Sequence, residues 1–190
     1  MNFSIWTPYQ AFYIHSMLFN CQSAIISIDK LHHAFEECNP VNSIHTLSAH
    51  EILNELQNIV LQGASLSRYF WPVRKGYSNR GEFLRKALNV NEKSPLKSRE
   101  LRNAIEHFDE RLDEYISNEI TGIILPEFVG NRPQNDGIPG HFFRAYFLDY
   151  DVFKLLDTEY EMNSLVSEII RLNEILTSLH NNGGVFKYST

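Results

Sequence analysis

The chain has 190 residues, of which 43% are hydrophobic and 13% aromatic, and its formal net charge is −6. This composition excludes a disordered chain, and the length suffices for one domain with a sizeable apolar core. No apolar run is long enough to cross a bilayer, and the N-terminal segment lacks the basic residues that open a signal peptide. We therefore expect a cytoplasmic protein without membrane association.

The cysteine pattern agrees with that location. Cys21 and Cys38 lie 17 residues apart on one predicted helix, which separates them by roughly 25 Å of helical rise. A disulfide needs Cα atoms within about 7 Å, so the two thiols cannot pair while that helix is intact. Unpaired cysteines are typical of a reducing compartment.

The first third of the chain predicts two long helices. Apolar residues at helical spacing indicate a helix from about Gln10 to Glu37, which Asn39-Pro40 ends. Ser48 and Glu51 match a capping box, which predicts that the second helix begins there and continues to Trp71-Pro72. A short helix follows near residues 81–88.

The next predicted helix is long and occupies the middle of the chain. Ser94 supplies a capping hydroxyl and Pro95 suits the first helical position, so the helix should run from there to about Asn118. Apolar residues of its expected core stripe recur every three or four positions: Leu101, Ile105, Phe108, Leu112 and Ile116.

From Thr121 the pattern changes. Frequent proline and glycine predict a long irregular loop, and residues 142–148 and 152–156 predict two strands joined across 149–151. A last helix is expected over 162–180. The predicted fold is therefore mainly α: an up-and-down bundle of four long or medium helices and a short one, with a β-hairpin inserted before the C-terminal helix. A single domain spans 1–190, with the irregular loop and hairpin at about 121–160.

The middle helix carries the residues with the clearest chemical meaning. Arg102 is followed directly by Asn103, and His107 comes five residues after the arginine. An arginine can hold a phosphate by charge and paired hydrogen bonds, and a histidine can move a proton near neutral pH. This pattern resembles the arginine–polar–x3–histidine motif of the HEPN superfamily, a group of small helical domains that includes RNA-cleaving toxins and defence proteins.

The resemblance implies a homodimeric, metal-independent endoribonuclease of a toxin–antitoxin or defence system. Arg102 would bind and polarise the scissile phosphate, His107 would act as general acid–base, and Asn103 would orient one of them or the phosphate. The RNA 2′-hydroxyl would attack and leave a 2′,3′-cyclic phosphate. The implied partners are RNA, a second copy of the chain, and an antitoxin or another protein of the same operon.

Helical geometry bears on how such a site would form. Five residues of helix separate Arg102 from His107 by about 140° around the axis. The two side chains of one helix therefore do not converge on one small group. Two such helices side by side across a two-fold axis would bring them together, as the resemblance also implies.

A second interpretation of the motif is open. Five carboxylates surround His107 on the neighbouring turns: Glu106, Asp109, Glu110, Asp113 and Glu114. They repel a phosphate, although they favour a protonated imidazole. In this interpretation the chain is a non-catalytic HEPN-like module that binds protein or RNA. The Arg/His pair is then structural or lies in the dimer interface, with Arg102 paired to Glu106.

The basic residues are concentrated in one stretch. Residues 68–102 contain ten Lys or Arg against three Glu, a local charge of +7, whereas the remainder of the chain carries −13. Such a stretch is typical of an RNA-binding surface, and its alternative is a solvated face that offsets acidic neighbours. The RNA-binding residues that we predict lie between its start and Lys86: Arg68, Arg74, Lys75, Arg85 and Lys86. The histidines have no zinc-ligand spacing and no cofactor motif occurs, so we expect neither a metal nor a cofactor.

Overall fold

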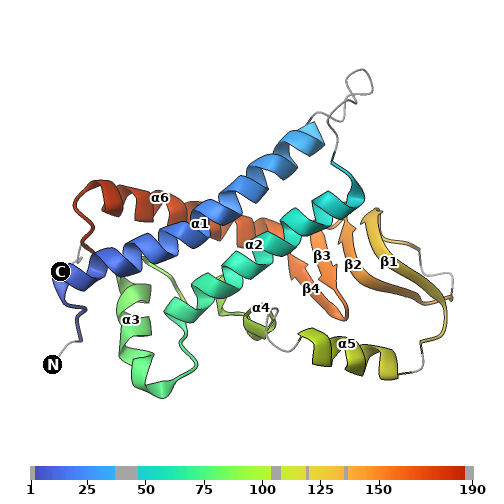
Figure 1. Ribbon diagram of the computed structural model, residues 1–190, viewed down its shortest axis with the longest axis horizontal. Helices are drawn as coiled ribbons and strands as arrows, with labels where there is room; N and C mark the ends of the chain where they lie inside the picture. The colour runs from blue at the N-terminus through green and yellow to red at the C-terminus, as the bar shows by residue number, and fades with distance from the viewer. Residues whose placement is uncertain (1–2, 37–46, 104–107, 119, 135–136, 187–190) are drawn as a thin grey trace.

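The computed structural model describes residues 3–36, 47–103, 108–118, 120–134 and 137–186 (Figure 1). In chain order its elements are α1 (Thr7–Glu36), α2 (Ala49–Phe70), η1 (Lys75–Tyr77), α3 (Ser78–Ala87), η2 (Pro95–Lys97), α4 (Arg99–Asn103), α5 (Phe108–Ser117), β1 (Ile123–Gly130), β2 (Gly140–Phe147), β3 (Val152–Leu155), β4 (Thr158–Glu161) and α6 (Met162–Asn181).

Three long helices form one layer. α1 packs against both α2 and α6, and the predicted capping box of α2 is confirmed, because the Ser48 hydroxyl accepts from the Glu51 amide while Glu51 accepts from the Ser48 amide. Gly63 allows α2 and α6 to approach closely. A Cβ atom at this position would lie 2.9 Å from a methyl group of Leu165.

The two ends of the described chain are also joined. Buried Gln10, near the start of α1, accepts a hydrogen bond of 2.8 Å from the amide of Phe186, five residues after α6. The same glutamine donates to the Ile5 carbonyl. One buried side chain therefore ties the segments before α1 and after α6 together.

A four-stranded mixed sheet packs on α2 (Figure 1). Its order is β1-β2-β3-β4, with β1 parallel to β2 and the other neighbours antiparallel. Tyr146 and Phe153 join the main core with the helices. Ala145 and Phe147, which alternate with Tyr146 on β2, face the other side and form a smaller apolar cluster with Phe128.

The prediction of a helical bundle with one β-hairpin is therefore wrong. The predicted hairpin exists as β2 and β3, but β1 and β4 extend it to a sheet. Pro126 and Gly130 favoured a loop over β1, yet an edge strand tolerates proline because one side of its backbone is unpaired. The turn into β4 contains neither glycine nor asparagine, the residues that usually indicate such a turn. Buried Leu156 adopts the left-handed conformation there instead (φ +54°), so the sequence contains no sign of the turn.

The continuous helix predicted over 94–118 is also wrong in its first half. The Ser94 hydroxyl caps the short helix η2, as expected. Ser98 then has an extended backbone (ψ 133°), and α4 begins only after it. Residues 104–107 lie outside the described part of the chain. Leu101 is buried, but Ile116 at the other end of the predicted core stripe is 54% exposed.

The buried thiol of Cys21 gives a first test of the packing. Burial raises its pKa to about 12, so its thiolate fraction at pH 8 should be about 10³-fold below that of a free cysteine. In a Cys38→Ser variant, a neutral disulfide reagent should label the native protein correspondingly slowly, and the same protein in denaturant at once. Rapid labelling of the native form would contradict the burial. Cys38 itself lies outside the described residues.

Candidate functional site

Two residues of the motif, Arg102 and Asn103, fall at the end of α4. Leu101 points into the core and Asn103 is exposed, which agrees with the predicted helical phase. Arg102 belongs to the same helix, which packs against α2. The Arg102 side chain and all of His107 lie outside the described residues. The geometry between the arginine and the histidine therefore stays a prediction.

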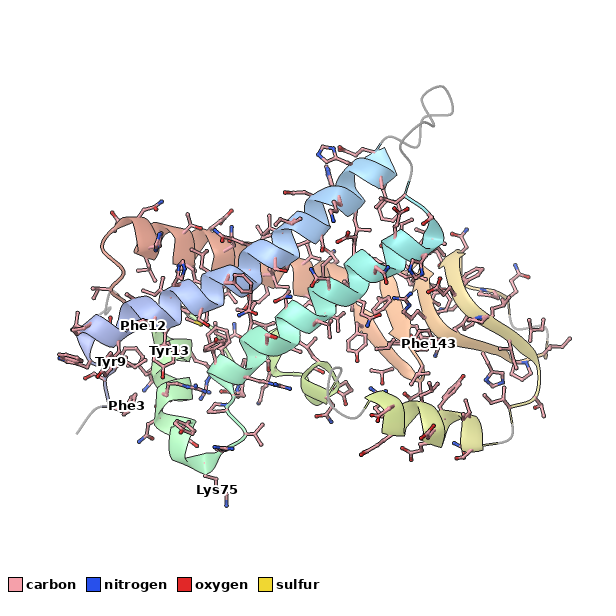
Figure 2. The ribbon with its side chains drawn as sticks, in the orientation of Figure 1. Phe3, Tyr9, Phe12, Tyr13, Lys75 and Phe143 are labelled. Carbon is pink, nitrogen blue, oxygen red and sulfur yellow. The ribbon has the colours of Figure 1, made fainter. Side chains whose placement is uncertain are left out.

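The predicted RNA-binding residues lie at the end of α2 and in the segment through α3. Arg74 and Lys75 are exposed in the turn between the two helices, and Lys75 points away from the body of the protein (Figure 2). Arg68 lies in the last turn of α2. These three residues form one corner of the molecule.

Two other predicted residues, Arg85 and Lys86 of α3, contact carboxylates instead. Lys86 forms an ion pair of 2.7 Å with Glu82, one turn earlier. Arg85 donates to the carbonyl of Phe70, and its Nε lies 3.5 Å from Glu92. Arg85 therefore helps to satisfy the C-terminal carbonyls of α2, a structural role that limits its availability to a ligand.

A cavity opens beside this corner, where α1, α2 and α3 meet. Its volume is about 490 Å³. Aromatic, small polar and cationic side chains line it: Ser16, Phe19, Asn20, Ser65, Arg68, Tyr69 and Arg80. The hydroxyls of Ser16 and Tyr69 are hydrogen-bonded across it at 2.5 Å.

Arg80 is a cation of this cavity that was not among the predicted RNA-binding residues. Its guanidinium lies 5.7–5.9 Å from the ring centroids of Tyr13, Tyr69 and Tyr77, within cation–π range. One of its terminal nitrogens donates to the Arg68 carbonyl, and its buried Nε has no hydrogen-bond partner among the described residues. The one feature of the sequence that pointed to Arg80 was its position in the basic stretch. Its contacts with the three tyrosine rings form only when the chain folds.

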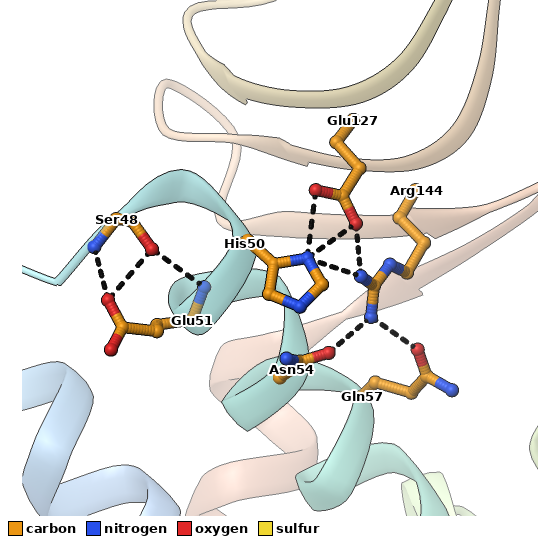
Figure 3. A network of polar contacts seen from close by, with 7 residues as sticks. All are labelled: Ser48, His50, Glu51, Asn54, Gln57, Glu127 and Arg144. Atoms are coloured by element: carbon orange, nitrogen blue, oxygen red, sulfur yellow. Dashed lines mark hydrogen bonds and ion pairs between the residues drawn. The ribbon is translucent and has the colours of Figure 1, made fainter.

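A second polar cluster joins α2 to the sheet (Figure 3). Buried Arg144 of β2 donates to Asn54 and Gln57 of α2, at 2.6 and 3.0 Å, and pairs with Glu127 of β1. His50 lies 3.1 Å from Glu127 and 3.3 Å from Arg144. No local sequence pattern assigns a role to Arg144 or Glu127, because α2, β1 and β2 are distant in sequence.

The electrostatics of this cluster indicate a structural bridge. Hydrogen bonds from Arg144 and, more weakly, from His50 hold the pKa of Glu127 below its ordinary value. The carboxylate thus stays charged and neutralises the buried guanidinium. Both terminal nitrogens of Arg144 are hydrogen-bonded within the cluster, and its Nε is buried without a partner among the described residues, so little of the guanidinium is open to a substrate.

Among the described residues, no three His, Cys, Asp or Glu side chains gather as metal ligands would. None of the described helices is long and apolar enough to cross a membrane. The chain matches no protein-family model, no curated protein and no solved structure. The resemblance to the HEPN superfamily therefore rests on the motif residues alone.

Proposed function

We propose that this chain is an RNA-interaction module that binds single-stranded RNA at the corner formed by α2, η1 and α3. The observation that carries the proposal is the cavity in which Arg68 and Arg80 lie beside Tyr69 and Phe19. Proteins that bind single strands combine cations along the backbone with aromatic rings on which bases stack. Both kinds of group are present there, with exposed Tyr77 close to Arg80.

The charge distribution supports this corner over the rest of the basic stretch. Lys97 and Arg85 both contact Glu92, and Lys86 contacts Glu82. These ion pairs offset much of the charge around α3. Arg74 and Lys75, by contrast, are exposed at the tip of the turn, where a phosphate backbone that enters the cavity would pass.

The test removes three cations from the corner. In Arg68→Ala/Arg74→Ala/Lys75→Ala, the slope of log affinity against log salt should decrease by about 2, since each phosphate contact to a single strand contributes about 0.7. Affinity at low salt should fall about 10–100-fold, because three charged contacts are lost. Fluorescence anisotropy with a labelled oligouridine measures both quantities.

A matched control removes three positive charges elsewhere. Lys30, Lys97 and Lys154 each pair with a glutamate, and their triple alanine variant has the same net charge as the test variant. It should bind RNA close to the wild-type affinity. Equal losses in both variants would mean that net charge alone governs binding, and the proposed site would be wrong.

A second function, cleavage of the bound RNA, is favoured by the orientation of α4. Leu101 is buried and Asn103 exposed, so the helix presents Asn103 of the motif outward. Arg102, Asn103 and His107 would then form a metal-independent site in a dimeric toxin or defence protein of the cytoplasm, with an antitoxin or another operon product as partner. The RNA 2′-hydroxyl would give its proton to a general base and bond to phosphorus, as the 5′-oxygen leaves with a proton from the general acid.

A further inference from the structure

The outward side of α1 carries large apolar side chains at a regular spacing. Phe12, Phe19 and Ile26 follow one another at intervals of seven residues, and they are 73%, 69% and 59% exposed. This spacing sets them in one stripe, about 10 Å apart along the helix. Figure 2 labels Tyr9 and Phe12, which lie in the N-terminal part of this surface. We call Phe12, Phe19 and Ile26 the α1 stripe.

The stripe lies in a helix segment without charged residues. Residues 7–28 contain no Asp, Glu, Lys or Arg, although the solvent side of a surface helix ordinarily carries them. Aromatic residues without charges are typical of the core of a protein–protein interface. A membrane surface fits less well, because helices that lie on membranes carry Lys or Arg on their polar face.

A hollow lies on the same surface. A cavity of about 550 Å³ is lined by Ala11, Phe12, His15, Ser16, Phe19 and His180. The surface thus presents both protruding rings and a recess beside them. A surface with both features can fit a second copy of itself across a two-fold axis.

The exposed area is of the order that a dimer needs. An aromatic side chain can bury about 150–250 Å², so the exposed parts of the stripe with Trp6 and Tyr9 provide on the order of 500 Å². That is more than half of the roughly 800 Å² per partner in a stable interface. Each copy carries a net charge of −6, so two copies repel each other over most of their surface. The helix segment that carries the stripe has no charged residues, and two copies can therefore meet there without this repulsion.

We propose that the α1 stripe binds a second copy of the chain, with the two α1 helices antiparallel and Phe19 close to the two-fold axis. Phe12 of one copy then meets Ile26 of the other. The antiparallel arrangement separates the charged C-terminal halves, and it puts Asp29 of each copy near the positive N-terminal end of the other helix. A parallel pair would bring the two Asp29 carboxylates together.

This interface adjoins the proposed RNA-binding cavity, but dimerisation can be measured without RNA. It also differs from the interface that the HEPN resemblance implies, because Arg102 and Asn103 of the motif lie on α4, which packs against α2. Phe19 lines both the apolar hollow and the cationic cavity. A second copy seated on the stripe would therefore form part of the rim of the cationic cavity.

Light scattering on the purified full chain tests the interface. At micromolar concentration the wild type should have twice the 22.1 kDa mass of the chain. Phe19→Asp should weaken association about 10²-fold or more, since it places two carboxylates at the axis. Phe19 is exposed, so circular dichroism should be unchanged. Val73→Asp, at a 77% exposed apolar residue outside α1, should remain dimeric.

Cysteine cross-linking tests the arrangement. Ser16 and Gln22 are exposed and lie three residues on either side of Phe19, so an antiparallel pair brings Ser16 of one copy near Gln22 of the other. In a Cys38→Ser background, Ser16→Cys/Gln22→Cys should form an intermolecular disulfide, whereas neither single variant should. A monomeric wild type, a dimeric Phe19→Asp variant, or cross-linking by Gln22→Cys alone would each overturn the proposal.

Discussion

His107→Ala should lower the rate of RNA cleavage by about 10²–10⁴-fold, because that is the usual contribution of a positioned acid–base group. The measurement is the single-turnover cleavage of a labelled RNA. Products should end in a 2′,3′-cyclic phosphate, and EDTA should leave the wild-type rate unchanged, since the attacking group in the proposed reaction is the 2′-hydroxyl. Arg102→Ala should cause a loss of similar size by removing the cation that polarises the phosphate.

Three controls separate chemistry from structure. Helix content, molecular mass and RNA affinity of the His107→Ala protein should equal those of the wild type. A loss of folding or of the dimer would instead assign His107 a structural role, and the non-catalytic interaction module would then be the better description. Glu174→Gln, at an exposed carboxylate of α6 outside the acidic residues around His107, provides a substitution that should leave the rate nearly unchanged.

Arg144→Ala should destabilise the fold by about 2–4 kcal/mol, the range expected when one partner of a buried charge pair is removed. The variant loses the link from β2 to α2 and leaves Glu127 with His50 as its remaining partner in the cluster. For a chain of this size the melting temperature should fall by roughly 5–15 °C. Calorimetry or thermal circular dichroism measures the shift.

Lys86→Ala is the matched comparison, because its ion pair with Glu82 is exposed. Such pairs contribute less than about 1 kcal/mol. The pH dependence provides a second criterion. The folded pKa of Glu127 is lowered, so its stabilisation is present above the ordinary glutamate pKa and is lost as the pH falls through the lowered value. Arg144→Ala should remove most of that dependence. Equal melting temperatures in the two variants would show that the cluster does not hold the sheet on α2.

The features that the sequence predicted correctly are those encoded by neighbouring residues. The capping box at Ser48 and Glu51 marks the start of α2, and leucine spacing within 162–180 marks α6. The hairpin of β2 and β3 is likewise a local structure. Each depends on hydrogen bonds or packing between residues a few positions apart.

The features that were missed depend on contacts between distant segments. β1 is a strand because it pairs in parallel with β2. No local pattern predicts this pairing, and Pro126 within β1 indicates a loop instead. Arg80 becomes part of a cavity only when α1 brings Tyr13 beside it. In the sequence, Arg144 is a charged residue within an apolar strand, and a buried charge needs partners. Those partners come from α2 and β1, which are distant in the chain.

The packing of α1 against α6 has a consequence for how the protein is made. A ribosome adds about 5–20 residues per second, so α1 is complete on the order of 10 s before α6, which begins at Met162, has been synthesised. During that interval the inner side of α1 has only α2 to cover it, while the outward rings of the stripe are present on the same helix. A nascent chain that exposes apolar surface on both sides of one helix is a natural ligand for chaperones, and neighbouring chains on one messenger can associate through it before either has folded.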